Sequence, residues 1–239
     1  MIPVDKLLYK LDLRLNKLAG TEHQYISIMD KILALNEAQL ILVKRKLNGN
    51  NIYRSGVDSF KKRYEDLQNL IIHFEETSTE KDTSIFTSYK VDLDNLTQPY
   101  FLPLEVSASC SKNSCSNRIL YLFDIVKHGD LQVMMNNNNY KPSFEYQETL
   151  GVISNNKLYI YTDTTFTVDK AYISYLKYPQ KIDKAGYTNY DGVASTDSNC
   201  ELSENLENEL LDIAMLELAM NTENSPQVEM SNIRNNQSE

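Results

Sequence analysis

The hydrophobic pattern of this chain changes its period twice, and this change constrains the fold more than any other feature. Over the first 75 residues, apolar side chains recur every three or four positions, which is the spacing of amphipathic helices. From about residue 84 the apolar runs become short, rich in tyrosine and bounded by polar residues, as in β-strands. Helical spacing returns near Leu202. The sequence therefore predicts an α+β fold in which a β-domain interrupts a helical bundle.

Three helices are expected before the β-region. The first follows Pro3 and ends at Gly20. The second is expected to open with a capping box at Thr21–Gln24 and to end at Asn48. The third has the clearest period, because its apolar positions step by 3, 4, 3, 4 and 3 residues: Val57, Phe60, Tyr64, Leu67, Ile71 and Phe74.

Turn signals divide the β-region into short strands. Asn155-Asn156 separates two apolar runs and predicts a hairpin turn, because asparagine tolerates positive φ. The asparagines at 136–139 predict a loop. Residues 168–178 carry apolar side chains on both faces before Pro179 ends the run, so this strand is expected to be covered on both sides.

A polar stretch over 179–200 precedes the last helix, for which Ser203 is the expected N-cap. The predicted division is a helical bundle from 1–80 and 200–220, with an inserted antiparallel β-sandwich or barrel-like domain over 81–180. Residues 181–199 form a loop in this interpretation. The polar segment 221–239 is expected to be extended or disordered.

The net charge of −9 is concentrated near the C-terminus. Between Lys184 and Arg234 there are ten acidic residues and no basic one. This pattern is typical of a solvated acidic helix face, and it also suits a surface that repels nucleic acid or meets a basic partner. Specific DNA binding is disfavoured, because no basic patch with interleaved aromatic residues occurs.

No catalytic or metal-binding constellation stands out. The chain has no glycine-rich phosphate loop and no G-x-S-x-G motif, and its three histidines stand singly. The spacing of Cys110, Cys115, His128 and Cys200 does not match a zinc site. We therefore predict no catalytic residues, no metal and no cofactor. The odd cysteine count suits a reducing compartment, and no apolar run is long enough to predict a membrane span.

Several segments carry a resemblance to a known family. They are Leu35–Gln39, Tyr178–Asp183, Gly186-Tyr187, Asp191-Gly192, Cys200–Leu202 and Glu209–Ala214. Together with the order of the elements, these segments resemble the head-to-tail connector proteins (adaptor or ring proteins) of short-tailed bacteriophages. They are most similar to the ring proteins of crAss-like phages. The region from 84 to 176 carries no matching motif.

The resemblance implies a non-enzymatic virion protein of the tail connector, assembled in the host cytoplasm. Such proteins form homo-oligomeric, twelve-fold rings that contact the portal protein and adjacent tail proteins and let double-stranded DNA pass without sequence preference. The acidic helix, with Glu204, Glu207, Glu209 and Asp212, is then expected to face the DNA channel. The C-terminal tail is expected to thread along a neighbouring subunit or the portal.

Two other function classes remain open from the sequence. One is a β-domain that binds a small ligand or carbohydrate, with the helices as an oligomerisation stem. The other is an enzyme whose site is assembled only in three dimensions, from at least two ionisable groups that converge in a cleft.

Overall fold

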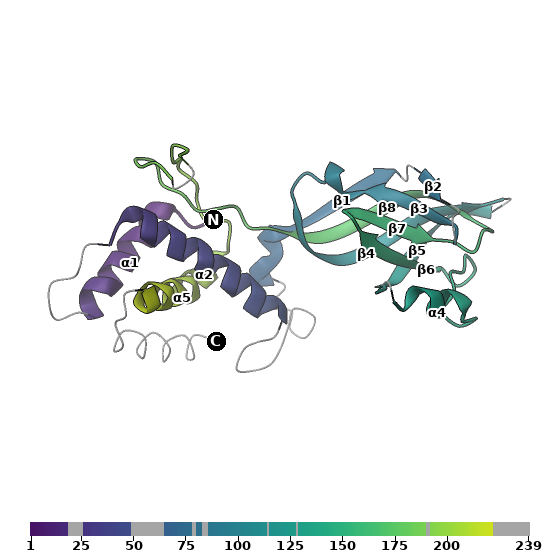
Figure 1. Ribbon diagram of the computed structural model, residues 1–239, viewed down its shortest axis with the longest axis horizontal. Helices are drawn as coiled ribbons and strands as arrows, with labels where there is room; N and C mark the ends of the chain where they lie inside the picture. The colour runs from purple at the N-terminus through teal and green to yellow at the C-terminus, as the bar shows by residue number, and fades with distance from the viewer. Residues whose placement is uncertain are drawn as a thin grey trace. The chain divides into compact units, whose positions relative to one another are not determined.

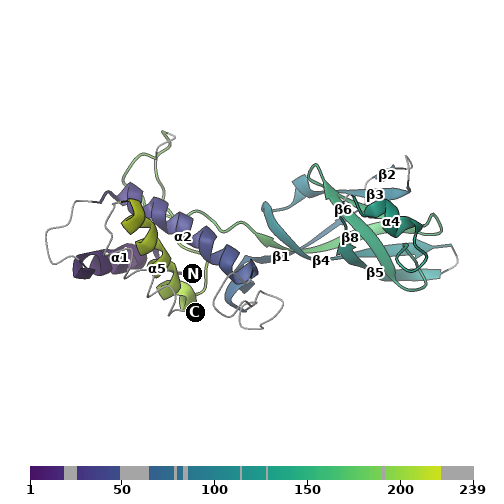
Figure 2. The same ribbon diagram turned by 60° about the horizontal axis from the view of Figure 1, so that its bottom comes forward.

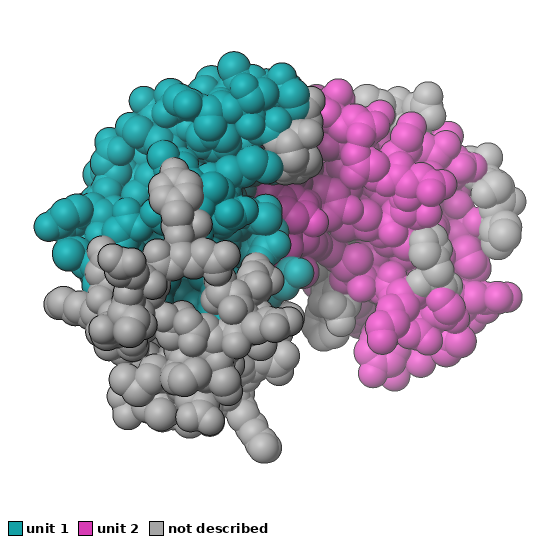
Figure 3. Space-filling model, turned by 60° about the vertical axis from the view of Figure 1, so that its left-hand side comes forward, with its two compact units in different colours: residues 1–70, 179–239 teal, residues 71–178 magenta. Residues whose placement is uncertain are grey.

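A computed structural model describes residues 1–18, 26–48, 65–77, 80–82, 86–113, 115–127, 129–189 and 192–221. The chain divides into two compact units (Figure 3). The helical unit comprises residues 1–70 and 179–239, and the β-domain comprises residues 71–178. The predicted α+β fold with an inserted β-domain is confirmed. The inserted domain begins at Ile71, and not at residue 81.

In the described part of the helical unit there are three long helices (Figure 1): α1 (Val4–Leu18), α2 (Ile28–Asn48) and α5 (Glu207–Asn221). Helix α5 packs against both α1 and α2. Its side chains are buried almost all round, because apolar residues occupy several faces of the helix: Leu210, Leu211, Ile213, Ala214, Met215 and Leu218. The last helix therefore completes the N-terminal bundle, as predicted.

Side-chain caps fix where α1 and α2 begin. The Val4 N–H donates to Asn199 Oδ1 at 3.0 Å. Ser27 Oγ accepts from the Asp30 N–H at 3.1 Å and donates to Asp30 Oδ2 at 2.7 Å. Residue 26 and Ser27 are not helical, so α2 begins at Ile28, later than the predicted start. The predicted capping box at Thr21–Gln24 lies outside the described residues.

The predicted third helix is wrong in its C-terminal part. A 3-10 turn ends at Leu70, and strand β1 (Ile71–Thr77) follows at once. This strand pairs antiparallel with β8, which places Phe74 opposite Ile173. The spacing of the apolar side chains suited a helix, but pairing with a distant strand decides the local structure. The earlier part of this prediction, at 49–64, lies outside the described residues.

The β-domain contains one eight-stranded sheet in the order β1-β8-β4-β5-β6-β7-β3-β2 (Figure 2). The other strands are β2 (Glu80–Asp82), β3 (Ser88–Asp92), β4 (Tyr100–Lys112), β5 (Cys115–Ile125), β6 (Glu148–Ser154), β7 (Lys157–Tyr161) and β8 (Thr167–Lys177). Neighbouring strands are antiparallel except β5 and β6, which are parallel and are joined through α4 (Leu131–Asn136). Strands β1 and β3 come close to each other, so the sheet curls toward closure.

The curled sheet encloses a single main core. Buried side chains from five strands meet there: Val91, Val106, Ala108, Leu120, Leu158, Ile160, Val168, Ile173 and Tyr175. In β8, Ala171, Ile173 and Tyr175 are buried on one face. On the other face Leu176 is buried but Lys170 is exposed, so the prediction that this strand is covered along both sides is wrong: the second face is mostly half-buried. Asn155 and Asn156 have φ values of 49° and 58°, which confirms the predicted hairpin turn between β6 and β7.

Candidate functional site

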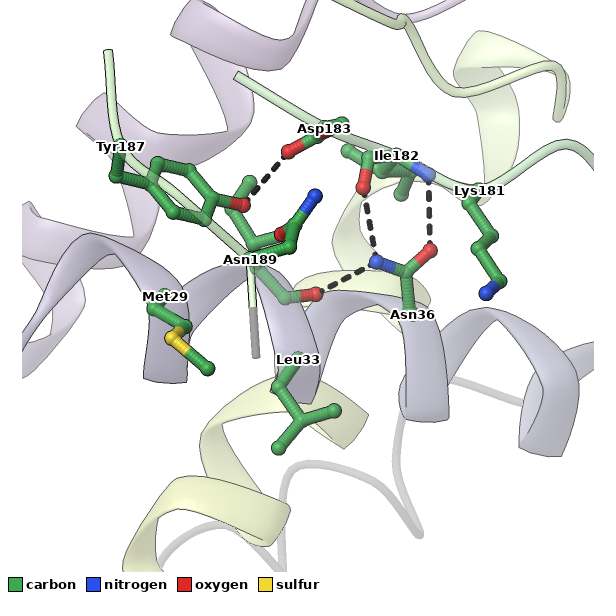
Figure 4. A pocket seen from close by; sticks show the side chains of 9 residues that line it. Met29, Leu33, Asn36, Lys181, Ile182, Asp183, Tyr187 and Asn189 are labelled. Carbon is green, nitrogen blue, oxygen red and sulfur yellow. Dashed lines mark hydrogen bonds between the residues drawn. The ribbon is translucent and has the colours of Figure 1, made fainter. Parts of the chain in front are cut away.

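Two polar side chains of α2 hold the segment that follows the β-domain: the half-buried Asn36, which Figure 4 shows, and the buried Gln39. Asn36 Nδ2 donates to the Ile182 carbonyl at 2.8 Å, and the Ile182 N–H donates back to Asn36 Oδ1 at 2.8 Å. Asn36 Nδ2 also donates to the Ile32 carbonyl at 2.9 Å. One helical turn further along α2, Gln39 Nε2 donates to the Gln180 carbonyl at 3.0 Å. Side chains of α2 therefore satisfy backbone groups of residues 180–182 that a neighbouring strand would otherwise bind.

The same segment is bound from its other side by residues near the start of α5. The Gln180 N–H donates to Glu201 Oε2 at 2.9 Å. Next to Glu201, Cys200 exchanges two backbone hydrogen bonds with Ile2, at 2.8 and 3.0 Å. Four stretches that are far apart in sequence therefore meet here, and we call this meeting point the junction: residues 2, 36–39, 180–183 and 199–202.

Burial shapes the chemistry of the Cys200 thiol. Its Sγ lies 3.5 Å from Gln39 Oε1, and the residue has no exposed surface. This burial raises the pKa of Cys200 to about 11, so the thiol stays protonated near neutral pH. At this position cysteine serves as a small packed side chain and not as a nucleophile.

Beyond the junction, Asp183 holds together the described residues of the predicted loop, 183–189 and 192–198. Asp183 Oδ1 accepts from the Tyr187 hydroxyl at 2.6 Å, and Asp183 Oδ2 accepts from the Thr196 N–H at 3.1 Å. Asp183 and Ser198 also exchange backbone hydrogen bonds. Burial alone would raise the pKa of Asp183, but the hydrogen bonds that it accepts outweigh burial and lower the pKa. An ionised Asp183 therefore organises the loop around itself.

Gly186 and Gly192 give this loop its shape. Their φ values are 120° and 80°, a region that residues with a Cβ rarely adopt. The glycines of the Gly186-Tyr187 and Asp191-Gly192 motifs therefore have a conformational role. For Tyr187, burial and the bond to Asp183 raise the pKa of the hydroxyl, which keeps it a hydrogen-bond donor.

A groove of about 170 Å³ lies between the N-terminal half of α2 and this loop (Figure 4). Met29, Ile32 and Leu33 form its apolar wall. Its polar rim comes from Asn36, Lys181, Asp183, Tyr187 and Asn189. Because the Asp183 and Asn36 side chains already bind the loop, the groove offers an apolar surface with a polar edge and suits contact with another side chain.

The acidic residues predicted to face a channel do not share one surface. Glu207 is 6% exposed and binds Lys6 and Lys10 of α1 at 2.9 and 2.8 Å. Glu209 binds Lys46 of α2 at 2.6 Å, and Asp212 pairs with Arg14. Of the four, Glu204 is the one that is exposed.

These ion pairs tie α5 to both of its neighbours. Burial alone would raise the pKa of Glu207, but Lys10 and Lys6 outweigh this effect and lower the pKa. Three of the four carboxylates therefore act inside the helical unit, where they balance the charge of lysine and arginine side chains. Acidic residues were visible in the sequence, but their partners were not.

Within the described residues, no group of three or more histidine, cysteine, aspartate or glutamate side chains could hold a metal ion. Cys110 belongs to the β-domain and Cys200 to the helical unit, and burial raises the pKa of Cys110 to about 12. His128 lies outside the described residues. No helix in the described part of the chain is long and apolar enough to cross a membrane.

The sequence marked the segments of the junction without assigning their roles. Asn36 and Gln39 lie in one of the segments that carry the resemblance, and Asp183, Tyr187 and Glu201 lie in the others. The polar side chain of Gln39 is 2% exposed, which the apolar pattern of this helix did not predict. A buried polar side chain needs a partner, but the sequence could not identify it.

In the comparison with protein families, the family described as phage tail ring protein 3/4 matches residues 5–229, a range that covers the β-domain, most of the helical unit and every stretch of the junction except residue 2. The comparison with curated proteins gave no match.

Proposed function

Because this chain belongs to the phage tail ring protein 3/4 family, we propose that it is a structural subunit that assembles with copies of itself into a closed ring in the phage tail connector. The observation that carries the proposal is the extent of the match, which spans residues 5–229 and therefore both compact units. A phage tail protein of this family is a component of the virion.

In this proposal the ring has twelve subunits, lies next to the portal protein, and joins the portal to the next protein of the tail. Its central opening continues the channel through which double-stranded DNA passes. The subunits fold in the host cytoplasm and join the particle there. No chemical step is needed for this role, since the subunit acts by its shape and its surfaces.

The junction supports a structural role of this kind. Its polar side chains are used to bind backbone groups of the same chain, as Asn36 does for Ile182 and Glu201 does for Gln180. Every copy in a ring must present the same surfaces, and hydrogen bonds that join distant segments of the chain help to keep these surfaces the same. The four stretches that meet at the junction all lie within the matched range or directly beside it.

The channel role proposed for the acidic helix now rests on Glu204, because it is exposed while its three companions are paired inside the helical unit. A negative charge at the channel wall would keep DNA from adhering. The C-terminal segment 222–239 lies outside the described residues, and we propose that it contacts a neighbouring subunit or the portal.

Electron cryomicroscopy of purified particles of the source phage tests this proposal. The expected result is a ring of twelve copies at the portal vertex, into which the helical unit and the β-domain fit as separate bodies. Mass spectrometry of the same particles should detect this chain at about the abundance of the portal protein. Absence of the chain from the particles would refute the proposal.

A further inference from the structure

The outer face of α1 carries an exposed stripe that is both apolar and basic. It consists of Lys6, Tyr9, Lys10 and Leu13, which lie on one side of the helix at i, i+3, i+4 and i+7. Tyr9 is 65% exposed and Leu13 is 41% exposed. The stripe itself carries two lysines and no carboxylate; both lysines bind Glu207 of α5, and Glu204 adds a second negative charge near Lys6.

The outer face of α2 carries a stripe of the opposite character. Asp30, Leu33 and Glu37 lie at i, i+3 and i+7, and all three are exposed. Leu33 is 47% exposed and is also part of the groove wall. This α2 stripe is therefore acidic at both ends and apolar in the middle, with a groove beside its apolar residue.

The two stripes match in length and in charge. Each runs over seven residue steps, or about 10 Å of helix. Lysines flank Tyr9 on α1, where Leu13 ends the stripe, and carboxylates flank Leu33 on α2. The groove of about 170 Å³ also suits one aromatic ring, since an apolar cavity of about 150 Å³ holds a benzene molecule. Tyr9 is the large exposed aromatic residue of the α1 stripe.

The stripes do not face each other within one subunit. Lys31 of α2 binds Asp12 of α1 at 2.7 Å, which marks the side of α2 that faces α1. At 100° per residue, the side chains of the α2 stripe point about 100° to 160° away from Lys31. Two complementary surfaces that point in different directions are what a head-to-tail ring requires, because every subunit must offer both.

We propose that the α1 stripe of one copy packs against the α2 stripe and groove of the next copy, with Tyr9 in the groove and the lysines beside Asp30 and Glu37. This inference rests on the proposed ring function and specifies the partner of the groove, which is a second copy of this chain. The contact is heterologous, so it propagates around a ring and does not close as a dimer.

Disulfide trapping in assembled particles tests the contact. The variant combines Tyr9→Cys and Leu33→Cys with Cys115→Ser, because Cys115 is the exposed native thiol while Cys110 and Cys200 are buried. Particles are grown from phage whose own copy of the chain carries these changes, and are then oxidised. The expected result on a non-reducing gel is a ladder of linked multimers. Variants with only one of the two new cysteines should give monomers.

Several outcomes would overturn the proposal. Incorporation of the double-cysteine chain without a ladder would do so, and so would dimers from either single-cysteine variant, since these indicate like-to-like packing. Pairing Leu33→Cys with Val133→Cys provides the matched control, because Val133 is 69% exposed but belongs to the β-domain. A ladder from this control pair would show that trapping is not specific.

A charge reversal on the α2 stripe gives a second readout that does not depend on cysteines. Glu37 is exposed on α2, so Glu37→Lys should leave the fold intact. It should reduce incorporation of the chain into particles roughly tenfold, because it places a cation against the two lysines of the next copy. Incorporation equal to that of the unchanged chain would contradict the contact. If the unchanged chain is itself absent from particles, the ring function fails, and not only this interface.

Discussion

Replacing Asn36 should loosen the helical unit at the junction. Asn36→Ala removes the acceptor of the Ile182 N–H and the donor to the Ile182 carbonyl, both at 2.8 Å. Ile182 is 1% exposed, so water cannot easily replace the lost partners. Leaving a buried backbone group unpaired costs about 1–3 kcal/mol. Because two such groups are affected and the alanine site can partly relax, we expect the free energy of unfolding of the helical unit to fall by about 2–4 kcal/mol.

Two measurements check this expectation. Urea denaturation reports the free energy of unfolding, and hydrogen exchange followed by mass spectrometry reports protection of the peptide that contains residues 180–183. Protection should be lost there in Asn36→Ala, and at least as much in Asn36→Asp, which keeps an acceptor but turns a carboxylate oxygen toward the Ile182 carbonyl. The control is Glu37→Ala, an exposed change on the same helix.

This reasoning would be refuted by a small loss of unfolding free energy that is not accompanied by faster hydrogen exchange at residues 180–183. If Asn36→Ala lowers the unfolding free energy by no more than the control and leaves exchange at 180–183 unchanged, the hydrogen bonds of Asn36 do not hold this segment to α2. The segment would then be fixed by the packing of Ile182 alone.

Three further predictions follow from ionisation and backbone geometry. The pKa of Glu207 is lowered in the folded state, so its contribution to stability is present above about pH 4.5 and is lost as the pH falls through the folded pKa. Glu207→Gln should therefore reduce the loss of thermal stability at acid pH, measured by thermal melts followed by circular dichroism. At pH 8 an alkylating reagent should modify Cys115 alone in the folded chain, and all three thiols after unfolding, as counted by intact mass. Asn155→Val should cost about 1–2 kcal/mol because Asn155 has positive φ, whereas Asn155→Gly should be close to neutral in the same denaturation assay.

Local signals in the sequence were sufficient for most of the architecture. The apolar positions of α5 predicted its return to the bundle, and two consecutive asparagines predicted the turn between β6 and β7. Each of these features depends on residues that are near one another in the chain. They could therefore be read from periodicity and turn chemistry.

Features that depend on distant partners were missed. Strand β1 was assigned to a helix because its apolar spacing suits one, and its partner, β8, lies about a hundred residues later. The acidic residues of α5 were treated as a free surface because charge counting does not show that Lys10 or Lys46 lies opposite. The junction combines both difficulties, since Asn36 and Ile182 are 146 positions apart.

The place where the chain crosses between the two units has a consequence for how such proteins can diversify. It leaves the helical unit after Leu70 and returns before Pro179, and the flanking strands β1 and β8 are direct neighbours that pair Ile71 with Leu176. The two ends of the insertion are therefore side by side, so one domain can be exchanged for another without moving the chain on either side. A phage lineage could in this way keep one helical scaffold and combine it with different β-domains as the neighbouring tail proteins change.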